Sequence, residues 1–336
     1  MRRVILFIQL SLYIILGAVS VAGEEEGSIS VPRHDRIASL CEKGGDLWLA
    51  DGRHIWHTSI ARINWVAANS PAEGRQVHVE FVSTSKGWIS RDDSLFETQD
   101  GGSHWQKLSF PKTFSMWGFK IGPDDDLWVY GENTGRALTK SEFLKAPRYT
   151  TTETADGRHL MLHPAFRKYK ANGTKEDVRP GVGSGSAVAL AFTNGRVAFA
   201  DPWNIFVTNG NGSLFKPTNA GSQDVLPTAI AASAGEFWFG NRDGAVKRLA
   251  PGSLDWTTLG SIYKSHSAVE QLFFYTTRDG YALGNERLYE STDGGGSWFD
   301  LGFSKVETAY FDSDKVFVLT ADKITVLPVN NYNSRR

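Results

Sequence analysis

The stretch Thr98-Gln-Asp-Gly-Gly-Ser-His-Trp105 returns, 193 residues later, as Ser291-Thr-Asp-Gly-Gly-Gly-Ser-Trp298. Both octapeptides follow the pattern Ser/Thr-x-Asp-x-Gly-x-x-Trp, and each stands between two short runs with strand-like composition. In a tight hairpin, Asp accepts backbone hydrogen bonds, Gly permits positive φ and Trp packs behind the turn. A turn sequence that occurs twice, 193 residues apart, indicates a repeat protein.

A second phrase supplies the period of the repeat. Trp48, Trp88 and Trp128 lie 40 residues apart, and each begins a short apolar strand after a polar turn. Related phrases return further along the chain, at Gly195–Ala200, Gly235–Gly240, Asp279–Gly284 and Asp314–Leu319. The sequence therefore contains seven copies of a unit of about 40 residues, each with room for four short strands.

Seven units of four strands predict an all-β fold, the seven-bladed β-propeller, with Asp-box turns in its blades. The last unit ends early, near Pro328, so we expect the N-terminal strand near Ser28–Val31 to complete it and close the ring. Rings of six or eight blades stay open as alternatives because the fourth and seventh copies are faint.

The two octapeptides resemble the Asp boxes of the BNR propellers, and the phrase before each is similar to the propellers of the photosystem II assembly and stability-factor type. The residues that carry this resemblance are Thr98, Asp100, Gly102, Trp105, Ser291, Asp293, Gly295 and Trp298. The resemblance implies that the box is a structural turn between the third and fourth strands, on the face opposite the ligand site. It implies less about function, because the propeller hosts many functions.

The N-terminus predicts export from the cytoplasm. Two arginines follow Met1, the stretch from Val4 to Ala22 is uncharged, and Ser20-Val-Ala22 has the small residues of a cleavage site. Residues 1–22 are therefore interpreted as a signal peptide, or as an uncleaved membrane anchor, and 23–336 as a single propeller domain. We expect the mature chain to be secreted, periplasmic or lumenal.

Composition narrows the function classes. A net charge of −1 argues against a nucleic-acid partner, and the single cysteine, Cys41, allows no internal disulfide and is expected to be buried. The chain shows no cofactor fingerprint and no convincing metal-ligand set.

Arginines gather in the predicted turns between second and third strands, where ring closure would bring them to one face. These are Arg53, Arg91, Arg136, Arg242 and Arg287. Residues of about 150–186 form an apparent insertion between blades 3 and 4 that adds Arg158, Arg167 and Lys168. The guanidinium fork suits carboxylates, so these residues form a candidate binding surface; ordinary solvated turns are the alternative, since acidic neighbours accompany them.

Three functions remain. The favoured one is a non-enzymatic scaffold or assembly factor that binds a protein partner, such as a membrane-complex subunit, on this face. A glycoside hydrolase is the second: resemblance to sialidases would imply an arginine triad and a Tyr/Glu pair, and other hydrolases use two acids that flank the glycosidic bond. Asp92, Asp93, Asp201 and Asp243 are available as such acids, without a distinctive spacing. A glycan-binding propeller could instead use Trp117 and Trp203 as stacking faces.

Overall fold

The computed structural model describes residues 27–34, 39–146, 150–183, 186–208, 215–219, 227–262, 267–312 and 314–329. This part of the chain is built almost entirely of strands, with one short helix, and none of its helices is long and apolar enough to cross a membrane. The predicted signal or anchor segment, 1–22, lies outside the described residues.

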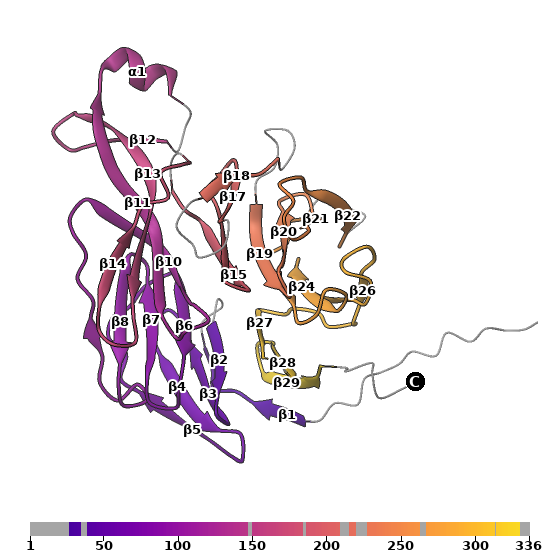
Figure 1. Cartoon of the computed structure of the whole chain (residues 1–336). Helices are drawn as coiled ribbons and strands as arrows, with labels where there is room; N and C mark the ends of the chain where they lie inside the picture. The colour runs from indigo at the N-terminus through magenta and orange to yellow at the C-terminus, as the bar shows by residue number, and fades with distance from the viewer. Residues whose placement is uncertain are drawn as a thin grey trace, which may run out of the picture.

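The strands form seven sheets arranged as a seven-bladed β-propeller (Figure 1). Blades 1 and 2 contain β2 (Ser39–Lys43), β3 (Asp46–Ala50), β4 (Ile55–Ser59), β5 (Arg62–Ala68), β6 (Val77–Phe81), β7 (Gly87–Arg91), β8 (Ser94–Thr98) and β9 (Gln106–Lys107). Blade 3 contains β10 (Phe114–Ile121), β11 (Leu127–Leu138), β12 (Thr151–Glu153), β13 (His159–Tyr169) and β14 (Lys175–Val178). Blades 4 and 5 contain β15 (Ala189–Thr193), β16 (Arg196–Ala200), β17 (Ile205–Thr208), β18 (Phe215–Pro217), β19 (Pro227–Ser233), β20 (Glu236–Asn241), β21 (Ala245–Leu249) and β22 (Thr257–Ser261). Blades 6 and 7 contain β23 (Gln271–Phe274), β24 (Gly280–Gly284), β25 (Arg287–Ser291), β26 (Phe299–Asp300), β27 (Thr308–Phe311), β28 (Lys315–Leu319), β29 (Lys323–Pro328) and β1 (Gly27–Ser30).

The N-terminal strand closes the ring, as the sequence predicts. β1 pairs antiparallel with β29 as the fourth strand of blade 7, in a register that places Ile29 opposite Ile324. First strands of neighbouring blades contact each other, as β2 does with both β6 and β27, so these strands surround the centre of the propeller.

The hydrophobic core is divided among the interfaces between blades. Seven clusters of buried residues each join two neighbouring blades, and together they cover all seven interfaces of the ring. Leu47 and Phe317, for example, belong to the cluster between blades 1 and 7. Alternation along each strand explains this, because a blade must bury apolar side chains on both of its faces.

Both octapeptides form the turn between the third and fourth strands of their blades, with matching hydrogen bonds. Gly102 N donates to Thr98 Oγ1 at 2.9 Å, and His104 N donates to Asp100 Oδ1 at 2.8 Å. In blade 6, Gly295 N and Ser297 N donate to Ser291 Oγ at 2.8 Å and to Asp293 Oδ1 at 2.9 Å. Trp105 and Trp298 pack against the cores between blades 1 and 2 and between blades 5 and 6. The two aspartates therefore hold their turns together.

The octapeptide turns also accept hydrogen bonds from the preceding blade. Trp48 Nε1 donates to the carbonyl of Gly101 at 3.2 Å, and Trp238 Nε1 donates to the carbonyl of Gly294 at 3.0 Å. Each indole also stacks on a phenylalanine of the next blade: Trp48 on Phe81 with ring centroids 3.8 Å apart, and Trp238 on Phe274 at 4.2 Å.

Blade 3 differs from the sequence prediction. The extra residues lie within blade 3, whereas the prediction placed an insertion at about 150–186 between blades 3 and 4. β13 and β14 fall inside that range and are the third and fourth strands of blade 3. Gly131–Arg136, which has the composition of a turn, continues β11, and the ladder with β13 runs from Leu127 opposite Tyr169 to Leu138 opposite His159.

The outer part of this ladder forms a projection, which we call the arm and define as residues 134–146 and 150–162. It contains the end of β11, the helix α1 (Lys140–Lys145), β12 and the start of β13. Figure 1 shows α1 at the far end of the arm, away from the other blades.

Candidate functional site

The arm has a small core of its own and an exposed apolar tip. Leu138 and Leu162 are buried, and the ring of Phe143 stacks on that of His159 with centroids 3.9 Å apart. Leu144 of α1 is instead 73% exposed, the largest exposed fraction among the large apolar side chains of the described chain. The arm therefore presents apolar surface at the point farthest from the blades.

Local sequence fixes the helix at the tip. Thr139 and Glu142 form a capping box, in which each side chain accepts a hydrogen bond from the other residue's backbone N–H. Arg136 Nη2 donates to Glu142 Oε1 at 2.9 Å, and this contact, with the hydrogen bonds from Thr139, lowers the pKa of Glu142 to about 2. Arg158, on the neighbouring hairpin of the arm, pairs with Asp156 at 2.8 Å. Both arginines are exposed on the arm, so this part of the predicted basic surface lies together.

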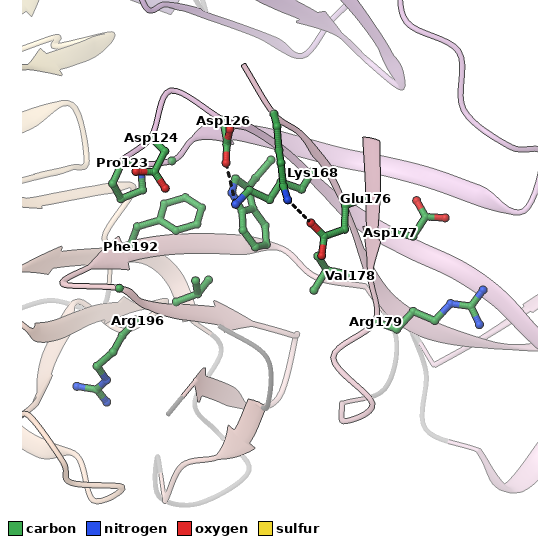
Figure 2. Close-up of a pocket in the computed structure, with 15 residues that line it drawn as sticks. Pro123, Asp124, Asp126, Lys168, Glu176, Asp177, Val178, Arg179, Phe192 and Arg196 are labelled. Atoms are coloured by element: carbon green, nitrogen blue, oxygen red, sulfur yellow. Dashed lines mark ion pairs between the residues drawn. The ribbon is translucent and has the colours of Figure 1, made fainter. Parts of the chain in front are cut away.

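A cleft of about 670 Å³ opens between blades 3 and 4, on the face of the turns that join first to second strands (Figure 2). Its apolar wall contains Trp128, Val178, Phe192 and Val197. Its charged groups are four basic side chains, Lys168, Lys170, Arg179 and Arg196, and four acidic ones, Asp124, Asp126, Glu176 and Asp177.

Two ion pairs join four of the eight charged residues of this cleft. Lys168 Nζ lies 2.7 Å from Asp126 Oδ2, and Lys170 Nζ lies 3.1 Å from Glu176 Oε2. Lys168 also sits over the ring of Trp128, with its Nζ 5.2 Å from the ring centroid. Figure 2 shows Asp126, Lys168 and Glu176 directed toward the same space. Asp126 and Glu176 are therefore each paired with a lysine.

Arg91 is not part of an exposed surface, contrary to the sequence prediction. It is the last residue of β7, 2% exposed, and its guanidinium donates to the carbonyl oxygens of Asp51 and His54 in blade 1 and to Ser70 Oγ. Burial also lowers its pKa. Arg91 therefore joins blades 1 and 2.

The other predicted basic residues are dispersed. Arg53 and Arg242 are exposed in the turns between second and third strands of blades 1 and 5. Arg287 begins β25 and donates to Asp300 at 2.6 Å, at the outer edge of blade 6. Arg167, on β13, pairs with Asp177 and lies over the ring of Phe114. Of the predicted set, Arg91 is thus excluded from an exposed surface, Arg136 and Arg158 lie on the arm, and Lys168 lines the cleft between blades 3 and 4.

The acids considered for glycoside hydrolysis differ in their surroundings. Asp201 is fully buried and accepts hydrogen bonds from the backbone N–H groups of Trp203 and Asn204 at 2.8 and 2.6 Å. Asp92 accepts from the N–H groups of Gln76 and Arg75, which lower its pKa. Asp93 and Asp243 are exposed side chains in such turns.

Two further sequence predictions concern Cys41 and Trp117. Cys41 is buried, as predicted, and burial raises the pKa of its thiol to about 12, so the thiolate is strongly disfavoured. Trp117, on the innermost strand of blade 3, is 54% exposed. No group of three or more His, Cys, Asp or Glu side chains in the described ranges is arranged to hold a metal ion.

Sequence reasoning missed α1, its exposed Leu144 and the cleft. The helix had a readable signal, since Thr139-Lys-Ser-Glu142 has the spacing of a capping box. The cleft has no such signal in the sequence, because it depends on how β13 and β14 of blade 3 are positioned relative to blade 4.

Comparison with known proteins extends the description of the fold. No family model matches the chain, and no curated protein sequence is significantly similar to it. Among solved structures, YCF48 bound to a D1 peptide is similar, with a TM-score of 0.62 and 16% identity over 90% of this chain and 94% of that one. YCF48 from Cyanidioschyzon merolae gives a TM-score of 0.59 at 16% identity, over 91% and 99% of the two chains. Virginiamycin B lyase from Staphylococcus aureus gives 0.65 at 11% identity, over 90% and 98%. At these identities the likeness establishes the propeller fold, which both binding proteins and enzymes use.

Proposed function

We propose that this protein is a non-enzymatic scaffold or assembly factor that binds a protein partner through blade 3, with the arm as its principal contact. The observation that carries the proposal is the arm itself, a projection with a capped helix on which Leu144 exposes apolar surface to solvent. Exposed apolar groups rimmed by charged side chains are typical of protein-binding surfaces. Lys140 and Lys145, one turn before Leu144 and next to it in α1, are the exposed charged residues nearest to it in the helix.

Two lines of support narrow the partner and the compartment. The YCF48 structure, similar in fold, is described as bound to a D1 peptide, which makes peptide recognition a natural use of such a ring. The N-terminal sequence favours a location outside the cytoplasm, where a membrane-complex subunit would be an available partner.

Removing the arm tests the proposal, and the structure shows where to cut. Thr134 and Leu162 lie opposite each other in the β11–β13 ladder, so an Asn-Gly turn can replace residues 135–161 and keep the rest of blade 3. The matched control is the double variant Arg53→Ala/Arg242→Ala, which alters exposed charges elsewhere on the ring. Partners are isolated from extracts of the source cells by affinity purification and identified by mass spectrometry.

Loss of a specific partner in the arm deletion, with retention in the control, supports the proposal. A photo-crosslinking amino acid at position 144 should then capture that same partner, and one placed at Val66, which is 57% exposed on β5, should not. Retention of every partner after arm deletion would refute the assignment to the arm, and glycan binding without any protein partner would refute the scaffold itself.

A further inference from the structure

The interface between blades 2 and 3 lacks the contact that Trp48 and Trp238 make elsewhere. Trp88 occupies the same place on β7 that Trp48 occupies on β3, is 2% exposed, and belongs to the core shared with blade 3. Its Nε1 is buried and has no hydrogen-bond partner among the described residues. A buried indole N–H without an acceptor is unusual and costs stability.

Both groups that would meet this indole are changed in blade 3. Phe81 lies seven residues before Trp88, and Phe274 lies seven residues before Tyr281. The residue seven before Trp128 is Ile121, which has no aromatic ring. The octapeptide turn is also missing. A shorter turn joins β13 to β14, closed by a hydrogen bond of 2.9 Å from Lys170 N to Thr174 O. Blade 3 therefore offers Trp88 neither a stacking ring nor a glycine carbonyl.

A pocket of about 340 Å³ lies at this interface. Trp88, Leu127 and Tyr169 line it, together with Ala171 and Gly173 of the short turn. The turn between third and fourth strands of the next blade thus borders the pocket, as an octapeptide turn borders Trp48 and Trp238.

The charges around the pocket are mostly basic. Three lysines line it, Lys86, Lys170 and Lys175, against one carboxylate, Glu97, which accepts a hydrogen bond from Gln99. Glu176 pairs with Lys170. Lys86 and Lys175 lie over the rings of Trp88 and Tyr169, with Nζ 5.2 and 5.5 Å from the centroids, and neither pairs with a carboxylate within the described ranges. The pocket lining thus combines a tryptophan whose indole N–H lacks a partner with two ammonium groups that pair with no described carboxylate, and this set suits an anionic acceptor.

We propose that this pocket binds a peptide carboxylate, with one oxygen accepting the hydrogen bond from Trp88 Nε1 that a glycine carbonyl accepts at the other two interfaces. The negative charge faces Lys86 and Lys175. The carboxylate belongs to an acidic side chain or to a chain end, and in the cell it would come from the protein partner, so this site deepens the proposed function and rests on it.

Nuclear magnetic resonance of the indole N–H groups tests the site directly. The chain contains 11 tryptophans, and the variant Trp88→Phe identifies the Trp88 resonance by its disappearance. Four synthetic probes are titrated into the intact protein: N-acetyl tetraglutamate amide, the corresponding tetraglutamine, tetra-alanine with a free C-terminus, and its amide. The proposal expects a saturable downfield shift of Trp88 with at least one carboxylate probe and none with the uncharged pair.

Two controls separate binding from general effects. The Trp48 resonance should stay in place, since its N–H is already bonded to Gly101. Lys86→Gln/Lys175→Gln should weaken binding at least tenfold, and this result does not depend on the folding of Trp88→Phe. The glutamate and alanine arms distinguish a side chain from a chain end.

An unshifted Trp88 resonance with both carboxylate probes, or equal shifts with the uncharged peptides, would overturn the site. Unchanged affinity in the double lysine variant would overturn it as well. These results are independent of the arm experiment. If no peptide binds the pocket but a partner is still captured at position 144, only the proposed pocket site is refuted. If a peptide binds the pocket but no partner is captured at position 144, the assignment of the partner to the arm is refuted.

Discussion

Arg91 of blade 2 donates a hydrogen bond from its guanidinium to the backbone carbonyl of Asp51 in blade 1. Asp51 is itself fully buried, and its Oδ1 accepts from the N–H groups of Arg53 and His54 at 2.7 and 2.6 Å. The turn between the second and third strands of blade 1 is therefore held from both sides. Arg91, which the sequence predicted to lie on a binding surface, instead connects blades 1 and 2.

Replacing Arg91 should destabilise the propeller. Arg91→Ala removes the Arg91 donor of the Asp51 carbonyl, whereas the His54 carbonyl keeps the N–H of Asp51 at 3.1 Å. We expect the free energy of unfolding to fall by about 2–4 kcal/mol. Urea unfolding followed by far-ultraviolet circular dichroism measures the change. The exposed Arg242→Ala should stay within about 0.5 kcal/mol of the parent, and an equally mild effect of Arg91→Ala would contradict the connector role.

Two tryptophan substitutions of equal size should differ in cost. Trp238→Phe removes the hydrogen bond to Gly294 and leaves that carbonyl unpaired, whereas Trp88→Phe removes a donor that has no partner in the described chain. We expect Trp88→Phe to cost less than Trp238→Phe by at least about 1 kcal/mol. Both are measured by urea unfolding without added peptide, and equal losses would show that the indole N–H of Trp88 is satisfied in solution.

Glu42 should make the free energy of unfolding depend on pH between 4.5 and its raised pKa. The residue is 8% exposed, and burial, followed by the nearby Asp312 carboxylate, raises its pKa from 4.5. The folded protein therefore binds this proton more tightly than the unfolded chain. The resulting stabilisation is complete at low pH and is lost as pH rises from about 4.5 through the raised pKa.

Glu42→Gln tests that reasoning, because glutamine stays neutral and keeps the oxygen that accepts from Gly45 N at 2.7 Å. We expect the melting temperature at pH 7 to rise by about 1–4 °C, and the gain to shrink as the pH falls from the raised pKa of Glu42 toward 4.5. Thermal unfolding over pH 4–8 measures it. A gain that is the same at every pH would mean that the charge of Glu42 is not responsible.

Ring closure should depend on the side chain of Ile29. It is buried in the core between blades 7 and 1, so Ile29→Ala should reduce the free energy of unfolding by about 2–4 kcal/mol. Ser28→Ala, exposed on the same strand, is the matched control and should be close to neutral. If both variants unfold like the parent in urea, β1 does not contribute to closure.

The sequence predicted the features that repeat and missed those that do not. Strands of five or six residues around Trp48, Trp88 and Trp238 recur with local turn signals, so the blades and the closing strand could be predicted. Gly131–Arg136 has the composition of a turn, yet pairing with β13 carries it as strand past a register shift between Thr134 and Ala137. Tertiary pairing overrode local propensity there.

The candidate site was less predictable because it depends on contacts between blades. Exposed and buried arginines look alike in sequence, and Arg91 is buried only because carbonyl groups of blade 1 meet it. In the same way, the missing acceptor of Trp88 is a property of the neighbouring blade and leaves no mark in the residues around Trp88 itself.

The pairing of β1 with β29 also sets an order of events during synthesis. The first strand emerges about 280 residues before β27, the strand that begins the blade it must complete. At about 5–20 residues per second, Gly27–Ser30 waits roughly 15–60 s for its partner. Six blades can assemble in that interval while the seventh cannot. The ring therefore becomes fully cooperative only after β29 has been synthesised and has paired with β1.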